Sequence, residues 1–524
     1  MNEDPHERTA RGARLVGAGI IVSRVLGLVR GKVMSYYVGS SLQADAYTAA
    51  LRIPNVLRNL LGEGAISASF VPVYAAALER GDEKGARAMA NALLGVLLAG
   101  VAVLTLAGIA SAPLLTSLLT HGYVGAKAEL TTRLMRVLFP MTGLMVLSGW
   151  CLGVQNAHRR FFMAYASGAV WSAVQIGLLL VAGPGAPDLT TLVWWLSWAT
   201  LAGSALQIAA QVPQVLRLMG SVRPSLDTAA PGLRETIANF LPVVGALGLF
   251  QISGFIDIQI ASFLPEGSLA NLNYANQIYM LPLSLFGVAA AAAALPQMAR
   301  DTARGNVAAL GPGLARGWER VVFYTIPSAV AFIGIGDCIV GLLNEGGKFS
   351  REQRVLVHGI LAAYALGLVA YSSSRLLASS YQASRNYRRP LISAAWAIAV
   401  SAAVGVSLAL SFRTRTFAVA GLALGGAVGA HVNLVLLWRG LRRQIGAIDL
   451  SGPVRVARRT LAVSVAALVP SLALRLVMSG RSIQLTALLV IPVFCVTFLL
   501  IARRAGLEEG ERLYASVTRR LKRK

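Results

Sequence analysis

Apolar stretches of about 20 residues alternate with short polar segments along almost the whole chain. A stretch of that length crosses the roughly 30 Å hydrocarbon core of a membrane as one helix. A helix is expected because backbone exposed to lipid must pair internally. The pattern therefore predicts an all-α polytopic membrane protein with about fourteen transmembrane helices. The predicted spans are residues 15–38, 45–78, 88–119, 130–156, 162–183, 190–216, 236–264, 270–298, 317–343, 355–383, 390–411, 416–438, 457–478 and 483–503.

The polar segments between these spans are too short to form a soluble domain. The longest, near 217–235, 299–316 and 439–456, hold about twenty residues each. The segment at 217–235 predicts two six-helix bundles around a central cavity, as in transporters whose substrate site lies between two repeats. The predicted parts are a cytoplasmic N-terminus at 1–14, an N-terminal bundle at 15–216, a cytoplasmic linker at 217–235, a C-terminal bundle at 236–438, two additional helices with their preceding loop at 439–503 and a basic cytoplasmic tail at 504–524.

The chain carries a formal net charge of +25, although only 14% of its residues are charged. Its basic residues concentrate in alternate short loops, which is the pattern of cytoplasmic anchoring in membrane proteins. We therefore expect both termini in the cytoplasm and no binding to nucleic acid. The basic tail is expected to lie along anionic membrane lipids, with a solvated anchor that has no specific partner as the alternative.

No segment carries the pattern of an enzyme. The Gly347-Lys348 pair lacks the first glycine and the Ser or Thr of a phosphate-binding loop, so nucleotide hydrolysis is not expected. The 5 histidines and 3 cysteines are scattered without metal-ligand spacing. We expect neither catalysis nor a bound metal or organic cofactor.

Four arginines fall within the first two predicted spans, at Arg24, Arg30, Arg52 and Arg58. An ionisable side chain at membrane depth is costly and by default faces a wet cavity. On a helix, Arg24 and Arg30 would lie about 9 Å apart along the axis and about 120° apart around it. Either a wide cavity wraps the helix, or Arg30 reaches the far interface. Because guanidinium groups bind phosphate and carboxylate oxygens in bidentate fashion, the cluster predicts an anionic substrate.

The second span combines these charges with a helix breaker. Asp45 and Arg52 fall on nearly one face two turns apart, and Asn55 neighbours Arg58. Pro54 cannot donate to the helix ladder, which predicts a kink or break near Arg52. A broken helix at membrane depth is tolerated where it lines a cavity, so these polar residues are candidates for substrate binding.

Three more charged residues lie at membrane depth. Glu63 stands between two glycines that add a second soft point, and both Glu63 and Asp45 either contact the substrate or neutralise an arginine. Asp257 has no oppositely charged neighbour in sequence, which suits a coupling cation or proton. The alternative for Asp257 is an ion pair with an arginine on another helix. Arg375, in the middle of a later span, either completes the cationic lining or pairs with Asp257.

Several short motifs recur in the order typical of one transporter family. They are Ser-Arg-Val-Leu-Gly at 23–27 with Arg30, Asp45-Ala46, Pro54-Asn55 with Arg58, Glu63-Gly64-Ala65, Phe70-Val71-Pro72, Gly347-Lys348-Phe349 and Tyr381-Gln382-Ala383. Together they resemble the MurJ/MviN family of lipid II flippases. The resemblance implies the fold of the multidrug/oligosaccharidyl-lipid/polysaccharide (MOP) exporters and alternating access. It also implies essential roles for Arg24, Arg30 and Arg58, a supporting role for Asp45 and a candidate sodium site at Asp257.

The chain departs from the family pattern at two positions. Gln277 stands where the family usually has an arginine, and Gly31 stands where it often has an acid. One cationic residue of the pattern is therefore missing, and Arg52 or Arg375 could supply the charge.

The resemblance implies a flippase that moves lipid II, or a similar polyprenyl-diphosphate-linked precursor, across the bacterial cytoplasmic (inner) membrane. The membrane potential or a gradient of Na+ or H+ would drive it, because no nucleotide site is expected. Two alternatives stay open. One is a flippase or exporter for another polyprenyl-linked polysaccharide unit. The other is a transport-dead scaffold that recruits cell-wall synthesis enzymes.

Overall fold

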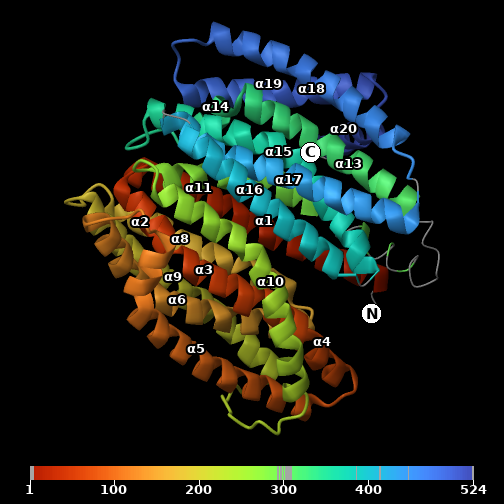
Figure 1. The fold of residues 1–524 in the computed structure, drawn as a ribbon. Coiled ribbons are helices and arrows are strands. Elements are labelled where there is room, and N and C mark those ends of the chain that lie inside the picture. Colours follow the sequence, from red (N-terminus) through yellow and green to blue (C-terminus); the bar gives the residue numbers. More distant parts are fainter. Residues whose placement is uncertain are drawn as a thin grey trace. The chain divides into compact units, whose positions relative to one another are not determined.

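Helices make up most of the computed structural model, which describes residues 5–288, 290–291, 294–295, 298, 300, 310–384, 386–411, 415–446 and 448–521. Within these ranges a bridge between Gly346 and Phe349 is the only β-type pairing. The prediction of an all-α membrane protein is confirmed (Figure 1).

The predicted number of spans is not confirmed. In the described part of the chain, 10 helices are long and apolar enough to cross a membrane. The bent pair α13 (Leu310–Gly334) and α14 (Gly336–Leu343) brings the number to 11. The helices α1 (Pro5–Val38), α10 (Leu233–Ser262) and α11 (Ser268–Pro282) cover predicted spans but do not belong to that set. Helix α11 holds 15 residues, which is shorter than a membrane span needs.

The helices group into two compact units. Unit 1 comprises Met1–Ala270 and the short segment Gly346–Phe349, and unit 2 comprises Asn271–Glu345 and Ser350–Lys524. The division falls within the first turn of α11, one helix later than the linker predicted at 217–235. The two six-helix bundles stay a prediction.

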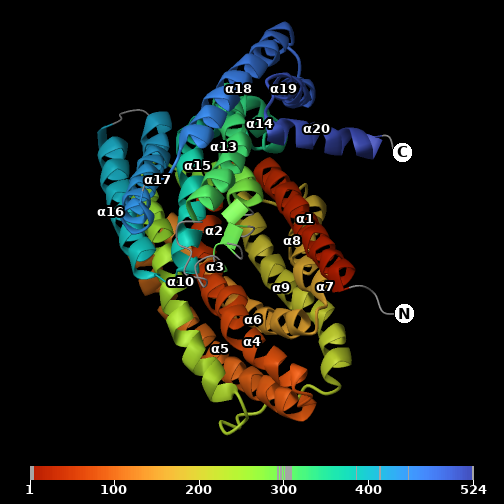
Figure 2. The same cartoon turned by 90° about the vertical axis from the view of Figure 1, so that its right-hand side faces the viewer.

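Unit 1 begins with α1 and a second span in four pieces: α2 (Leu42–Ala50), α3 (Arg52–Leu57), η1 (Arg58–Gly64) and α4 (Ala65–Glu79). It continues with α5 (Glu83–Leu119), α6 (Ala126–Ala157), α7 (Phe161–Ala166), α8 (Gly168–Ala182), α9 (Leu189–Met219) and α10. Helix α1 packs against α7 and α8, and α6 contacts both α5 and α9 (Figure 2). An apolar core of this unit includes Phe70, Met89 and Trp150, which come from α4, α5 and α6.

The second span breaks where the sequence predicts it. The helix is interrupted at Leu51, three residues before Pro54, and widens to a π-helix over η1. Gly62 of η1 crosses α6 at close range, because a Cβ placed on Gly149 would lie 2.7 Å from the Gly62 carbonyl carbon. Two facing glycines permit this approach of backbone to backbone. The segment predicted to be a soft point is thus held firmly against α6.

One polar contact fixes the end of α6. The Tyr74 hydroxyl lies 3.0 Å from His158 Nε2, and the two rings meet edge to face. Burial lowers the pKa of the His158 imidazole, while the carboxylate of Glu83 acts in the opposite direction. The folded chain therefore favours the neutral form of His158.

Unit 2 contains η2 (Leu283–Val288), α13, α14, α15 (Arg351–Ala383), α16 (Arg388–Ser411), α17 (Arg415–Ile445), α18 (Ser451–Val477), α19 (Ile483–Arg504) and α20 (Glu508–Leu521). The single span predicted at 317–343 is instead bent by 82° between α13 and α14, at Ile335. Gly334 and Gly336 flank this residue and free the backbone to turn. Arg475 of α18 binds Asp337 of α14 at 2.7 Å, which fastens the bend to the last helices.

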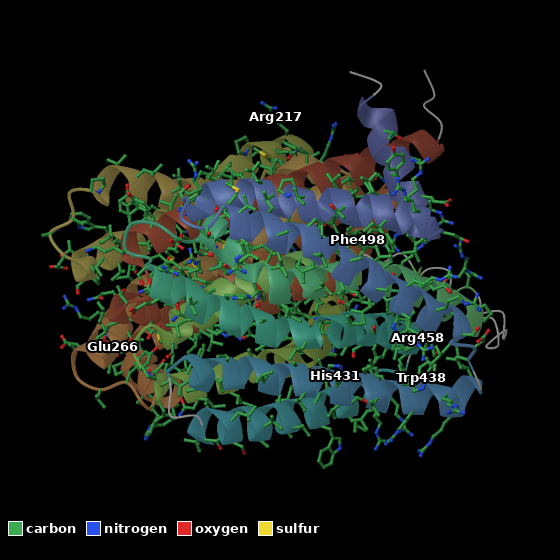
Figure 3. The ribbon with its side chains drawn as sticks, turned by 90° about the horizontal axis from the view of Figure 1, so that it is seen from above. Arg217, Glu266, His431, Trp438, Arg458 and Phe498 are labelled. Carbon is green, nitrogen blue, oxygen red and sulfur yellow. The ribbon has the colours of Figure 1, made fainter. Side chains whose placement is uncertain are left out.

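Helix α18 of unit 2 begins six residues after α17 ends. Figure 3 shows Trp438 and Arg458 toward the same end of the unit, with His431 farther along α17. The C-terminal segment forms α20, whose Glu509 accepts a hydrogen bond from Arg320 of α13 at 3.1 Å. Contact of this helix with anionic lipid stays a prediction.

Candidate functional site

Arg30 points from α1 onto the face of an aromatic ring. Its guanidinium carbon lies 4.4 Å from the centroid of the Trp171 ring on α8. The Trp171 indole nitrogen donates to the backbone oxygen of Thr200 on α9 at 3.1 Å, so the ring itself is held in place. A cation over an indole face is attracted by the ring quadrupole. The stack fixes the direction of the Arg30 side chain and leaves the N–H groups at the edge of its guanidinium free of the ring.

Arg58 lies near this stack and has the same charge. Arg30 and Arg58 are close enough for their positive charges to repel each other. Arg58 begins η1 and donates to Asn59 Oδ1 at 3.3 Å. Arg30 Nη1, Arg58 Nε and Asn55 Oδ1 are all buried and lack a hydrogen-bond partner among the described residues. Two neighbouring cations with unused donors form a site that favours an anion.

A network of hydrogen bonds joins the helices that hold Trp171. The Tyr47 hydroxyl lies 2.8 Å from Thr200 Oγ1 and donates to Gln175 Oε1 at 3.3 Å. Thus α2, α8 and α9 together position the arginine of α1. Tyr47, Trp171, Gln175 and Thr200 were not among the residues predicted from the sequence, because their partners lie far apart along the chain.

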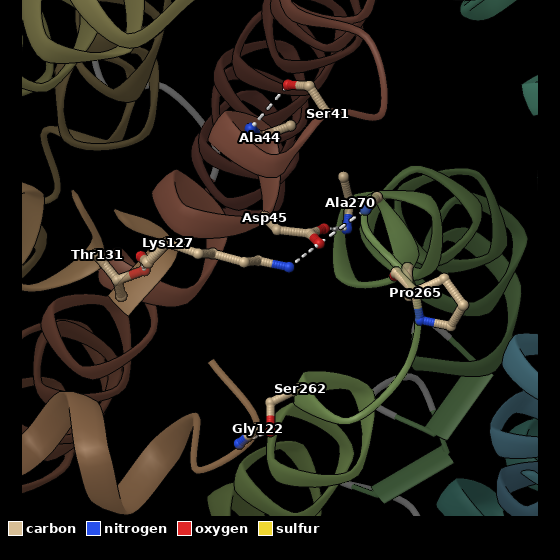
Figure 4. Close-up of polar contacts among 11 residues, drawn as sticks. Ser41, Ala44, Asp45, Gly122, Lys127, Thr131, Ser262, Pro265 and Ala270 are labelled. Carbon is tan, nitrogen blue, oxygen red and sulfur yellow. Dashed lines mark hydrogen bonds and ion pairs between the residues drawn. The ribbon is translucent and has the colours of Figure 1, made fainter. Parts of the chain in front are cut away.

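Asp45 forms a buried junction and has no vacant oxygen. It accepts hydrogen bonds from Lys127 Nζ at 2.7 Å, from the Gly267 amide at 2.8 Å and from the Ala270 amide at 2.8 Å. Figure 4 shows the carboxylate between the lysine and the start of α11. A second tie close by joins the Gly122 amide to Ser262 Oγ at 3.0 Å. These contacts favour the structural interpretation of Asp45 over direct contact with a substrate.

Lys127 is the partner of Asp45 that sequence reasoning missed. It precedes the predicted span at 130–156, so it reads as an ordinary loop cation. In the structure its side chain is only 10% exposed, and its ammonium group also lies 4.0 Å from the centroid of the Tyr123 ring. Ordinary lysines are rarely so buried unless they are paired.

Arg52 turns toward α10 rather than toward Arg30. Its guanidinium carbon lies 5.9 Å from the centroid of the Phe255 ring, and its charge attracts Asp257. This arrangement favours the alternative interpretation of Asp257, which was an ion pair with an arginine on another helix. Arg52 and Asp257 both belong to unit 1.

The surroundings described for the remaining predicted site residues do not include Arg30. Arg24 lies exposed on α1. Arg375 belongs to unit 2, where it donates to the hydroxyl of Tyr371 on its own helix at 3.2 Å. Gln277 is half-buried on α11. The side chain of Glu63 lies outside the described residues. Their roles in binding stay predictions.

Comparison with known proteins decides the family. The family model described as "Lipid II flippase MurJ" matches residues 34–494. The chain belongs to the MurJ family. A curated relative, the probable lipid II flippase MurJ of Rhizobium meliloti (strain 1021), is 33% identical over 436 residues, which cover 81% of this chain and 80% of the relative. The resemblance that the motifs of the second span carry is thereby confirmed.

Two solved structures share the fold. A structure of the lipid II flippase MurJ in an inward closed conformation superposes with a TM-score of 0.73 at 22% identity, covering 94% of this chain and 99% of that chain. An inward-facing multidrug resistance MATE family transporter of the MOP superfamily gives a TM-score of 0.68 at 16% identity, covering 82% of this chain and 96% of that one. The MurJ family and the MATE transporters thus share one helical architecture with this chain.

Proposed function

We propose that this chain is a flippase that moves lipid II from the inner to the outer leaflet of the bacterial cytoplasmic membrane. The observation that carries the proposal is the pair of neighbouring cations, Arg30 and Arg58, whose buried donors lack partners in the described part of the chain. Membership of the MurJ family supports lipid II as the cargo. The diphosphate of such a lipid offers the oxygen acceptors that two guanidinium groups bind most tightly.

Binding would use the arginines as a fixed and a movable element. Arg30 is held over Trp171 and would meet the diphosphate with a preset direction. Arg58 lies on a π-helix next to a helix break, where small backbone adjustments move it. The mutual repulsion of the two cations would be relieved once the anion lies between them. The polyprenyl tail would stay in the lipid.

The transport step would need no chemical reaction. The chain would act as a transporter and would draw on the membrane potential or on a gradient of Na+ or H+. We expect both termini on the cytoplasmic side, because basic residues mark that side. Asp257 would take part in coupling transport to the potential or the gradient, because its carboxylate would exchange one cationic partner for another.

Reconstituted vesicles provide the test. Lipid II is placed in both leaflets, and the fraction of headgroup accessible from outside is followed over time. The proposal expects the chain to raise the rate of exchange and the variant Arg30→Gln to lose this effect while it inserts normally. A chain that inserts normally but neither restores growth after depletion of the native flippase nor moves lipid in vesicles would favour the scaffold alternative. Movement of another polyprenyl-linked glycan, and not of lipid II, would favour the second cargo.

A further inference from the structure

The guanidinium of Arg52 lies against α10 at Gly254, a position without a side chain; this place is called the seat of Arg52. A Cβ placed on Gly254 would overlap the guanidinium of Arg52, so the arginine occupies the space that any other residue would fill. The neighbouring Phe255 ring flanks this space at 5.9 Å from the guanidinium carbon. Helix α10 contacts η1, and η1 follows directly after α3, the helix that carries Arg52. Gly254 and Phe255 thus border a space that one guanidinium group fills.

Asp257 completes this seat with a charge. It lies three residues after Gly254, and residues at that spacing are neighbours on one face of a helix. The charge of Arg52 acts on its carboxylate, and the side chain of Asp257 is half-buried. A carboxylate at this depth needs a cationic partner. Arg52, whose guanidinium lies against Gly254 on the same helix as Asp257, is positioned to be that cation.

The same arginine belongs to the segment that carries the anion site. Arg52 precedes Arg58 by six residues, on the short helix that leads directly into η1. An arginine that is shared between an internal carboxylate and an external anion can exchange one for the other, because both offer the same pair of oxygen acceptors. We propose that Asp257 is the resting counter-ion of Arg52 and that the diphosphate of the substrate displaces it.

This exchange rests on the proposed function, and it predicts a specific effect of Asp257 on the affinity for the anion. Asp257 competes with the substrate for Arg52, so removal of the carboxylate strengthens anion binding. A residue that merely holds the fold, or one that binds a cation in support of the substrate, would have the opposite effect. The exchange also returns Arg52 to α10 when the substrate leaves, which favours release of the lipid.

The first experiment measures equilibrium binding of farnesyl diphosphate to the full chain in detergent, with farnesol as the uncharged control. Asp257→Asn is expected to bind the diphosphate about tenfold more tightly, as couplings within one charge network allow. In the Arg52→Gln background the same change is expected to have no effect. Unchanged or weaker binding by Asp257→Asn, in a chain whose wild type prefers the diphosphate, would overturn the exchange.

A glycine pair on α10 provides a matched control. Gly254→Ala pushes the end of a flexible side chain aside, so it dislodges Arg52 and is expected to tighten diphosphate binding in the same direction as Asp257→Asn. Gly248→Ala gains the same helix propensity but meets open space, so binding is expected to stay unchanged. Equal behaviour of the two variants would contradict the seat.

A third measurement separates the two proposals. Thermal unfolding of Arg52→Gln, Asp257→Asn and the double variant, all without substrate, is expected to be non-additive because the residues interact. Additive effects would overturn the ion pair itself. If the pair is present but the wild type binds farnesyl diphosphate no better than farnesol, the proposed function is wrong and the exchange is wrong with it.

Discussion

The junction between Asp45 and Lys127 allows a quantitative prediction about stability. Lys127→Met keeps the length and most of the apolar stem of the side chain but removes its charge. The Asp45 carboxylate, 1% exposed, would then keep its two backbone donors and lose its only lysine partner in the described structure. The perturbation is therefore the loss of one charge from a buried pair.

Breaking a buried pair by removing one partner costs roughly 3–5 kcal/mol. The two amides of Gly267 and Ala270 still stabilise the carboxylate, so we expect the lower end of that range, about 3 kcal/mol. The double variant Asp45→Asn, Lys127→Met leaves no buried charge and is expected to lose less than Lys127→Met alone. Arg512→Met, which removes the pairs of an exposed arginine with Glu508 and Glu509, is expected to cost less than about 1 kcal/mol.

Unfolding can be followed through the buried thiols of Cys151 and Cys338, which react with a fluorescent maleimide only when the helices open. Denaturant titration in detergent then gives the free energy of unfolding for each variant. The reasoning would be refuted if Lys127→Met lost no more stability than Arg512→Met, or if the double variant were less stable than the single one.

Three other predictions concern the arginine site and the ends of the helices. Arg58→Ala is expected to abolish lipid II exchange in vesicles, whereas Arg520→Ala in the basic tail leaves the rate unchanged; equal tolerance would contradict an anion site on η1. Trp171→Phe is expected to keep most of the exchange rate and Trp171→Leu to lower it severalfold, because only an aromatic face attracts the guanidinium; equal rates would show that the stack is dispensable. His158 has a lowered pKa in the folded chain, so its contribution to stability is present above the unfolded pKa and is lost as the pH falls below about 6.5. Lowering the pH from 7.5 to 5 should therefore lower the midpoint of thermal unfolding more in the wild type than in His158→Gln.

Local features of the sequence predicted much of the fold. Hydropathy depends on neighbouring residues alone, so the helices and the break near Pro54 followed from the pattern. The bend at Ile335 was not predicted: Gly334 and Gly336 permit a turn, but the predicted span at 317–343 was read as one helix across them. Part of the difference in span count is a matter of helix length: α11 holds 15 residues, too few to cross the membrane alone.

The candidate site was predictable only in part. The excess of arginines predicted an anion site, and Arg30 and Arg58 do lie within reach of each other's charge. Their supports, such as Trp171, lie more than a hundred residues away in sequence, and no periodicity announces such a pairing. The contacts of Asp45 with Lys127 and the attraction between Arg52 and Asp257 are equally remote. The sequence offered pairing with an arginine as an alternative for both Asp45 and Asp257; the packing gives Asp45 a lysine instead and brings Asp257 within reach of the charge of Arg52.

The π-helix at Arg58–Gly64 has a consequence for how this region can vary. A π-turn amounts to one residue inserted into an α-helix, and one residue corresponds to about 100° of rotation. Deletion of a single residue there would leave a span of nearly the same length and hydropathy, but it would swing Arg52 of α3 away from its partners while Phe70 and Tyr74 kept their packing. The length of this segment is therefore under geometric constraint, and chains of this family should tolerate substitution within it more readily than insertion or deletion.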